Sequence, residues 1–326
     1  MNQRKLLTLS IKPTRYHSFR DVEYWQKLIE FKYKSIIIES CVHVWVLPLN
    51  ISQSTYGGRQ TQSFACTLIT VQIAYDFLDS SFRLPGFGTK TSRYIPNDML
   101  ETLVNAIVDG NETHEKVMKQ RRKGVARELR DNVSNTLTVP EAIQAHLPEM
   151  YEIDYHNYNG HFIGNLVSAL EMVVTSSLLR HLNRIPIGVL AYEKSTCLIY
   201  DRISHSICLI DTHRHFRDKT GSVIISSAYD NLTDFVVTVV KCAFHEVFRK
   251  ADLRGIFEIS CLMLIRLFKK SLHGRIFKEI TNCPIIIPAK KELFKIVERN
   301  EEAESDSDDG YRSWDDTSKR KSKRRQ

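Results

Sequence analysis

Four short apolar runs between residues 185 and 227 constrain the fold of this chain most strongly. They read IPIGVLAY, CLIYD, SICLID and SVIISS, and the polar stretches EKST and RISH separate the first three. Such short turns can join only neighbouring strands that run in opposite directions, because parallel strands need a long crossover. This part of the chain therefore predicts an antiparallel meander.

Helical periodicity surrounds the predicted meander. The stretch SFACTLITVQIAYDFL, residues 63–78, is apolar on nearly every side, which predicts a buried central helix. Further helices are expected over residues 21–33, 97–108, part of 113–131, 139–147, 164–182 and 232–248, and strands over 35–48 and 152–158. Helices and antiparallel strands in separate runs predict an α+β fold, with a helical subdomain packed on an antiparallel sheet.

The last 28 residues, 299–326, differ in composition from the rest. They contain an acidic, serine-rich block and then a basic block, with almost no aliphatic residues, which predicts disorder. Six of the final eight residues are Lys or Arg, a composition typical of nuclear-localisation or nucleic-acid-contacting tails. We expect a nuclear and/or cytoplasmic protein with an N-terminal helix/strand extension (1–39), a main domain (40–250), a C-terminal extension of it (251–298) and this tail.

Composition excludes some classes of protein. The chain has no apolar run long enough to predict a membrane-spanning helix. Its seven cysteines are scattered and odd in number, which favours reduced thiols over a disulfide framework. The formal net charge is +8, which is compatible with plain solubility and also with RNA or an acidic protein as partner.

The stretch LIDTHRHF, residues 209–216, carries candidate catalytic side chains. Asp211, His213 and His215 alternate, so on a strand they share one face. Residues two apart lie about 6.6–6.8 Å apart, so Asp211 reaches His213, whereas on a continuing strand His215 lies about 13 Å away. A carboxylate in that position fixes the tautomer of the imidazole and raises its basicity. Zinc ligation by the three residues and a plain polar strand end are the alternatives.

Cys66 is the candidate nucleophile. It lies in the first turn of the predicted central helix, with Ser63 as the expected N-cap, and the helix dipole there lowers the pKa of a thiol. A glutamine of the preceding loop, which contains Gln53 and Gln60, is expected to form an oxyanion hole with the Cys66 backbone N–H. With the later D-x-H motif, these residues indicate a papain-like cysteine hydrolase, although a cysteine on an apolar helix can also be plain core.

At these residues the sequence resembles the herpesvirus large-tegument-protein deubiquitinases. Gln53 in ISQS, the loop YGGRQTQ and Cys66 in FACTLIT are similar to that family's nucleophile region, and GVLAYEKSTCLIYDRISHSICLIDTH with GSVIIS to its closing strands. The resemblance implies that Cys66 is the nucleophile, His213 the general base and Asp211 the orienting acid. It implies Gln53 as the oxyanion amide, while papain-like spacing favours Gln60. It also implies ubiquitin or a ubiquitin-like protein as substrate, and no cofactor or metal is expected.

A different class of function stays open beside the hydrolase. The same domain without catalysis would be a papain-like scaffold that binds RNA or an acidic protein partner. Its binding surfaces would be the basic stretch over residues 116–130 and the basic tail.

Overall fold

The computed structural model describes residues 5–9, 31–38, 41–79, 82–85, 95–123, 133–180, 182–215, 219–249 and 253–267. The chain divides into two compact units, Met1–Ser271 and Leu272–Gln326, and the second lies outside the described residues. The predictions for residues 268–298 and for the tail therefore stay predictions. Across the described residues, no helix combines the length and the apolar character needed to span a membrane.

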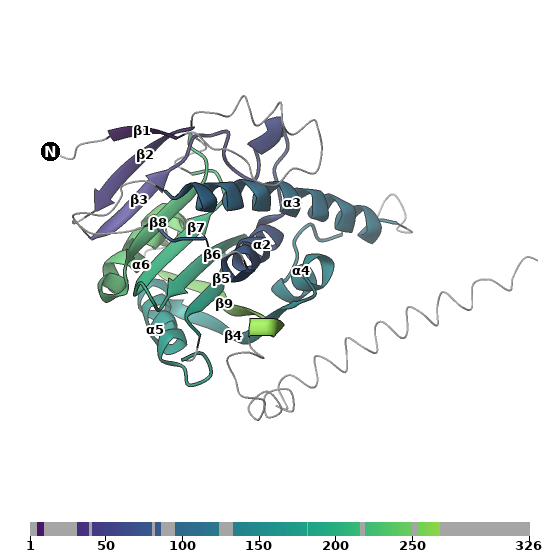
Figure 1. The fold of residues 1–326 in the computed structure, drawn as a ribbon. Coiled ribbons are helices and arrows are strands. Elements are labelled where there is room, and N and C mark those ends of the chain that lie inside the picture. Colours follow the sequence, from purple (N-terminus) through teal and green to yellow (C-terminus); the bar gives the residue numbers. More distant parts are fainter. Residues whose placement is uncertain are drawn as a thin grey trace, which may run out of the picture. The chain divides into compact units, whose positions relative to one another are not determined.

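The first unit is built on one antiparallel sheet (Figure 1). In the described part of the chain this sheet has nine strands in the order β1-β2-β3-β8-β7-β6-β5-β9-β4, and every neighbouring pair is antiparallel. The strands are β1 (Lys5–Leu9), β2 (Phe31–Ile38), β3 (Val42–Val46), β4 (Met150–His161), β5 (Arg184–Ala191), β6 (Lys194–Asp201), β7 (Ser206–Asp211), β8 (Val223–Ala228) and β9 (Arg254–Leu264).

The predicted meander is confirmed as β5-β6-β7-β8, in the centre of the sheet. Its strands are nearly continuous runs of buried residues, because helices cover both faces of the sheet. Helix α2 (Cys66–Asp79) packs on one face, with α3 (Asn97–Arg121) and α4 (Val139–His146) around it. On the other face lie α5 (Phe162–Thr175) and α6 (Leu232–Cys242). The expected fold class, α+β with a nucleophile helix packed on an antiparallel sheet, is confirmed.

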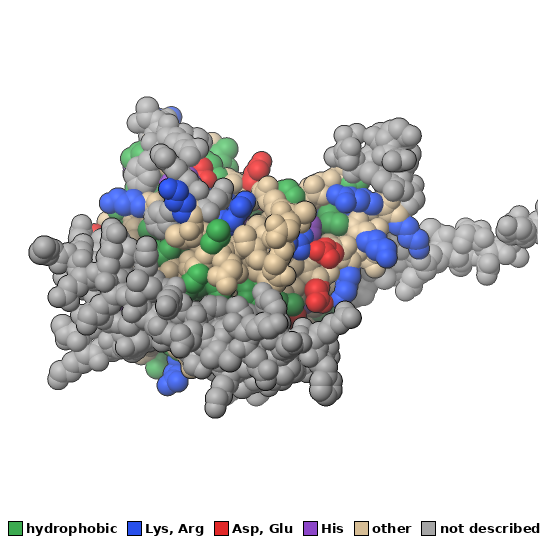
Figure 2. All heavy atoms as spheres, turned by 90° about the horizontal axis from the view of Figure 1, so that it is seen from above, with side chains coloured by type: hydrophobic (Ala, Val, Ile, Leu, Met, Phe, Trp, Pro, Cys, Tyr) green, Lys and Arg blue, Asp and Glu red, His purple; other side chains and the backbone are tan. Residues whose placement is uncertain are grey.

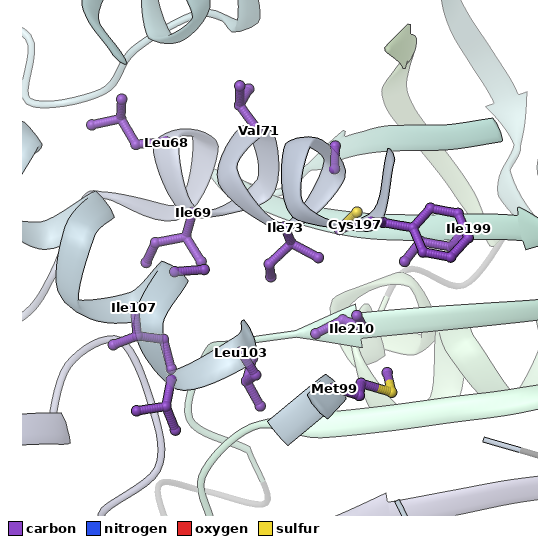
Figure 3. Close-up of a cluster of buried hydrophobic side chains, with 14 of the residues drawn as sticks. Leu68, Ile69, Val71, Ile73, Met99, Leu103, Ile107, Cys197, Ile199 and Ile210 are labelled. Carbon is purple, nitrogen blue, oxygen red and sulfur yellow. The ribbon is translucent and has the colours of Figure 1, made fainter. Parts of the chain in front are cut away.

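Helix α2 is the central helix that the sequence predicts. Eleven of its 14 residues are buried, so it contacts protein on nearly every side. Figure 3 shows Ile69 and Ile73 directed toward Leu103 and Ile107 of α3. Cys197 and other side chains of the meander close the same core from the sheet side. This packing fixes the N-terminal end of α2, where Cys66 lies.

The prediction of separate helices over 97–108 and within 113–131 is wrong, because α3 runs unbroken over Asn97–Arg121; residues 124–131 lie outside the described part of the chain. Gly110 does not end a helix. A Cβ at this position would lie 2.5 Å from Ile69 Cγ1, so the glycine allows α3 to approach α2 closely. The neighbouring Asn111 uses its side chain to donate to the backbone oxygen of Gln53 at 3.0 Å. Tertiary packing therefore keeps both helix-breaking residues inside one helix.

Several other element boundaries differ from those expected. Residues 31–33, expected at the end of a helix, belong to β2, and the rest of that helix lies outside the described residues. Helices α5 and α6 end earlier than predicted, and a 3₁₀ turn over His245–Arg249 follows α6.

Strand β4 is longer than predicted because it pairs with β9 along its whole length. Strand β9 also pairs with β5, so residues 254–264, expected only as an extension of the main domain, are part of the central sheet. The four-part domain division itself stays a prediction.

Candidate functional site

Cys66 is the first residue of α2, and its side chain is 5% exposed. The first N–H groups of a helix have no intrahelical acceptor, so this position favours a negatively charged sulfur. Ser63 does not cap the helix as expected. Its Oγ accepts the N–H of Ala65 at 3.1 Å and donates to Asn111 Oδ1 at 2.7 Å. Ser63 thus ties the entry of α2 to α3.

Asp211 and His213 lie where β7 ends. Asp211 is fully buried, and its Oδ1 accepts the backbone N–H of His213 at 3.0 Å and lies 2.6 Å from His213 Nδ1. The same imidazole lies close enough to the Cys66 sulfur to lower the pKa of the thiol, and the sulfur in turn raises the pKa of the imidazole. Because Nδ1 is engaged by Asp211, Nε2 is the nitrogen available to sulfur. The structure therefore brings the three residues together in the order Asp211–His213–Cys66.

The expected separation of Asp211 and His215 is wrong. His215 Nε2 lies 3.2 Å from Asp211 Oδ2, and the His215 side chain is 2% exposed. The expectation assumed a continuing strand, but β7 ends at Asp211 and the chain bends. His215 forms an antiparallel bridge with Thr220, with its N–H bonded to the Thr220 oxygen at 3.1 Å. Both oxygens of Asp211 thus face a histidine nitrogen.

The electrostatics of the site favour a thiolate–imidazolium pair. Burial raises the pKa of the Cys66 thiol, but the hydrogen bond and charge of His213, with bonds from Ser195, outweigh it and lower the pKa. Burial lowers the pKa of His213, but the charge and hydrogen bond of Asp211, followed by Cys66, raise it to about 10. The pKa of Asp211 is held well below its usual range, since His215 and His213 overcome the effect of burial. Both shifts therefore favour a negative charge on the sulfur and a positive charge on the imidazole.

The other buried thiols behave in the opposite way. Burial raises the pKa of Cys197, Cys208 and Cys261, and no comparable cationic partner offsets it. Burial also raises the pKa of Cys242 to about 11. Among these described cysteines, Cys66 is therefore the one poised for nucleophilic chemistry.

The two candidate oxyanion glutamines lie in different environments. Gln53 is buried, its Nε2 donates to the backbone oxygen of Ser63 at 3.2 Å, and its Oε1 accepts from Thr212 Oγ1 at 2.9 Å. It therefore joins the loop before the nucleophile to the middle residue of the D-x-H motif. Gln60 is exposed, and its Nε2 donates to the oxygen of Gly58 at 3.0 Å. The oxyanion role of either residue stays a prediction.

A cleft of about 840 Å³ opens beside Cys66. Residues of β4, β5 and β9 line it, together with the start of α4 and the turn between β5 and β6. The start of α4 is fixed by a capping box, in which Thr138 and Glu141 each bond the other's backbone N–H. A ligand in the cleft would therefore meet side chains from three different strands, β4, β5 and β9.

The lining of this cleft is acidic. Its two basic side chains are each held by a carboxylate: Arg121 Nη2 lies 2.6 Å from Glu141 Oε1, and Lys194 Nζ lies 2.7 Å from Glu246 Oε1. Three further carboxylates line the cleft, those of Glu152, Glu193 and Glu258. Burial, then the charge of Glu258, raises the pKa of Glu152 despite a bond from Ser260. The cleft therefore suits a ligand with basic groups.

Sequence reasoning missed Ser195, the second residue of β6, which lines the same cleft as Cys66. It lies inside an apolar hairpin, and no local pattern marks it as functional. Its Oγ is 2.9 Å from the Oγ1 of Thr67, the residue after the nucleophile. Only the packing of α2 against the hairpin brings these side chains together.

A second hollow, of about 750 Å³, lies at the end of α3 and is basic. Arg59, Lys119, Arg122 and Lys123 line it with the single carboxylate of Glu115, which pairs with Arg59 at 2.7 Å. Figure 2 shows Lys and Arg side chains at both the left and the right end of the face seen from above. Part of the predicted basic stretch, residues 124–130, lies outside the described residues.

A metal site is not apparent among the described residues. In the ranges that the structure describes, no group of three or more His, Cys, Asp or Glu side chains could hold one. In LIDTHRHF the two histidines contact the two oxygens of the same aspartate.

Comparisons with known proteins find similar solved structures. No family model matches the chain, and no curated protein matches it. The chain is similar to the ubiquitin-specific protease of a murine cytomegalovirus tegument protein, solved with a ubiquitin-based suicide substrate (TM-score 0.40, 11% identity, covering 66% of this chain and 84% of that one). It is also similar to the avirulence protein AvrPphB of Pseudomonas (TM-score 0.33, 9% identity, 61% and 92%).

Proposed function

We propose that this chain is a thiol-dependent hydrolase that cleaves a peptide or isopeptide bond after ubiquitin or a ubiquitin-like modifier. The observation that carries the hydrolase part is the alignment of Asp211, His213 and Cys66 at the head of a cleft. The ubiquitin part is supported by the sequence resemblance of the nucleophile region and closing strands.

The proposed mechanism needs no cofactor. The Cys66 thiolate attacks the carbonyl carbon, and the negative charge moves to the carbonyl oxygen, where the Cys66 backbone N–H and the Gln53 or Gln60 amide stabilise it. The His213 imidazolium then gives its proton to the leaving amine as the C–N bond breaks. A water molecule loses a proton to His213 and attacks the thioester, which releases the carboxylic acid and restores the ion pair.

The cleft supports a polypeptide as the acyl group. An extended segment that entered it would pass β5, β9 and β4, whose side chains line the cleft. The unneutralised carboxylates Glu152, Glu193 and Glu258 favour basic side chains in that segment. A modifier with an extended, basic C-terminal tail fits these requirements.

A ubiquitin probe with a C-terminal electrophile tests the proposal. We expect wild type to gain the mass of one ubiquitin, because the lowered thiol pKa of Cys66 makes it the reactive sulfur. Cys66→Ala should gain none. Intact-mass spectrometry after incubation is the measurement.

The control for this experiment is Cys242→Ala, which removes a half-buried thiol with a raised pKa and should leave labelling unchanged. An adduct that persists in Cys66→Ala would place the nucleophile at Cys242 or Cys197. Absence of any adduct with a panel of ubiquitin-like probes would contradict the hydrolase and favour the scaffold.

The second candidate function is RNA binding at the basic hollow. Arg59, Lys119, Arg122 and Lys123 offer positive charge for phosphates. Phe64, which is 38% exposed beside them, offers a ring on which a base can stack. If it holds, affinity for a labelled single-stranded RNA should fall steeply between ~50 and ~200 mM salt. Charge reversal at Lys119, Arg122 and Lys123 together should remove binding without affecting Cys66 labelling. Salt-independent binding, or binding that survives charge reversal, would rule this candidate out.

A further inference from the structure

The turn that joins β5 to β6 has an unfavourable backbone conformation. Ala191 pairs with Lys194 across it, so it contains only Tyr192 and Glu193, whose φ angles are 52° and 62°. Two-residue hairpins of this kind need positive φ at both positions, which Asn and Gly supply at least cost. A tyrosine and a glutamate there are strained, and such strain persists only where the surrounding structure holds the turn.

Contacts from neighbouring elements hold this turn. Lys194 Nζ donates to the backbone oxygen of Ala243 at 3.1 Å and to Glu246 Oε1 at 2.7 Å. The rings of Tyr192 and Phe162 lie 6.1 Å apart. The turn is therefore fixed against the end of α6 and the start of α5, and the strand that follows it starts from a defined position.

The register of the hairpin leaves the backbone N–H of Ser195 outside the sheet ladder. The pair that flanks a two-residue turn, Ala191 and Lys194, exchanges backbone hydrogen bonds, so the next pair, Leu190 and Ser195, does not. The Ser195 N–H therefore points to the other edge of β6, where pairing with β7 begins only at Cys197. It is available to a side chain at that edge.

Cys66 lies at that edge, since it lines the same cleft as Ser195. The backbone N–H and the hydroxyl of Ser195 both lower the pKa of the Cys66 thiol. Ser195 is 4% exposed and Cys66 5%, so little water screens this interaction. The Ser195 hydroxyl, 2.9 Å from Thr67 Oγ1, can accept from Thr67 while it donates to sulfur. The two hydroxyls then form a chain that ends on the thiolate.

We infer that Ser195 is a positioning residue for the nucleophile, whose N–H and hydroxyl hold the Cys66 sulfur as a thiolate opposite His213. The inference rests on the proposed function only in taking Cys66 as the nucleophile. It concerns the free enzyme, so its test needs no ubiquitin.

The test is the pH dependence of Cys66 alkylation by iodoacetamide, followed by peptide mass spectrometry. In Ser195→Ala the midpoint of thiolate formation should move up by about one to two pH units, because one hydrogen bond to a charged sulfur is lost. Below the midpoint the rate should fall about tenfold or more, while the plateau at high pH stays unchanged. Ser195→Thr retains the hydroxyl and should restore most of the midpoint.

Ser227→Ala is the matched control. Ser227 is a fully buried serine of β8 whose Oγ donates to the Cys41 backbone oxygen at 3.0 Å, so its loss removes a comparable bond elsewhere. Suppose that the wild-type midpoint lies below that of an ordinary thiol and that Ser195→Ala does not change it. This result would overturn the inference and leave the proposed function standing. An ordinary wild-type midpoint would overturn both.

Discussion

Turnover of a ubiquitin substrate is expected to fall by about 10⁴-fold or more in His213→Ala, as in other enzymes that lose the base of a triad. His213 is the group that lowers the thiol pKa of Cys66 most, against the effect of burial. Without it, a sulfur that is 5% exposed carries an unfavourable charge. In the proposed mechanism, the same variant also loses the proton donor for the leaving amine.

The dependence of kcat/KM on pH is the most specific test of the role of His213. In wild type, kcat/KM should rise with pH through the lowered pKa of Cys66 and fall again as His213 deprotonates near its raised pKa of about 10. In His213→Ala the falling limb should disappear, and Cys66 alkylation should require alkaline pH.

His205→Ala is the matched control for this variant. His205 lies in the turn between β6 and β7 and contacts Asp230 Oδ1 at 3.0 Å, away from the D-x-H motif. Its loss should leave both the rate and the profile unchanged. Wild-type turnover in His213→Ala would contradict the assignment of His213 as the base.

Replacing Asp211 by asparagine is the second change with a large expected effect. Loss of the orienting carboxylate lowers kcat by about 10⁴-fold in a comparable triad, because an amide favours the wrong imidazole tautomer. Here the effect should be accompanied by loss of stability. Asp211 is fully buried, and both its oxygens contact histidine nitrogens, at 2.6 Å and 3.2 Å. The asparagine presents an N–H₂ group to one of them.

Melting temperature measured as a function of pH separates the contributions of Asp211 and His213 to stability. The folded-state pKa of Asp211 is depressed, so its stabilising contribution is present above its unfolded pKa of about 3.9 and is lost as pH falls toward the folded value. The pKa of His213 is raised, so its contribution is complete below about 6.5 and is lost as pH rises through about 10. In Asp211→Asn, melting temperature should depend less on pH at both the acid and the alkaline end. The variant lacks the Asp211 carboxylate, and without that carboxylate the pKa of His213 is no longer raised.

His215→Ala is the informative comparison for Asp211→Asn. It removes the contact to Asp211 Oδ2 but leaves the bond between His213 Nδ1 and Oδ1. We therefore expect a lower melting temperature, with kcat within a few-fold of wild type. A catalytically dead His215→Ala together with an active His213→Ala would reverse the roles of the two histidines.

Local patterns predicted the elements that carry the site. Short apolar runs separated by short polar turns over 185–227 predicted the meander, and the all-round apolar stretch over 63–78 predicted α2 with Cys66 in its first turn. The D-x-H spacing predicted that Asp211 reaches His213, and the two side chains are in contact. Each of these features depends on residues close together in sequence, so the sequence alone contains the information.

Features that depend on distant contacts were not predictable in this way. Gly110 reads as a helix end, yet it lies inside α3 because Ile69 of α2 occupies the space of a Cβ. The alternation of LIDTHRHF separates His215 from Asp211, yet the bridge to Thr220 bends the chain and brings them together. At Gly110 a long-range packing contact overrides the local pattern, and at His215 a backbone bridge five residues on ends the strand alternation.

The sequence by itself thus determined which residue types the site contains and the elements that hold them. The tertiary structure decided the geometry: that His215 shares Asp211, that Gln53 is buried while Gln60 is exposed, and that Ser195 and Cys66 line one cleft. The physical reason is that side-chain periodicity is set within a few residues. How closely α2 packs against the β5–β6 hairpin, in contrast, depends on a core to which residues from the whole domain contribute.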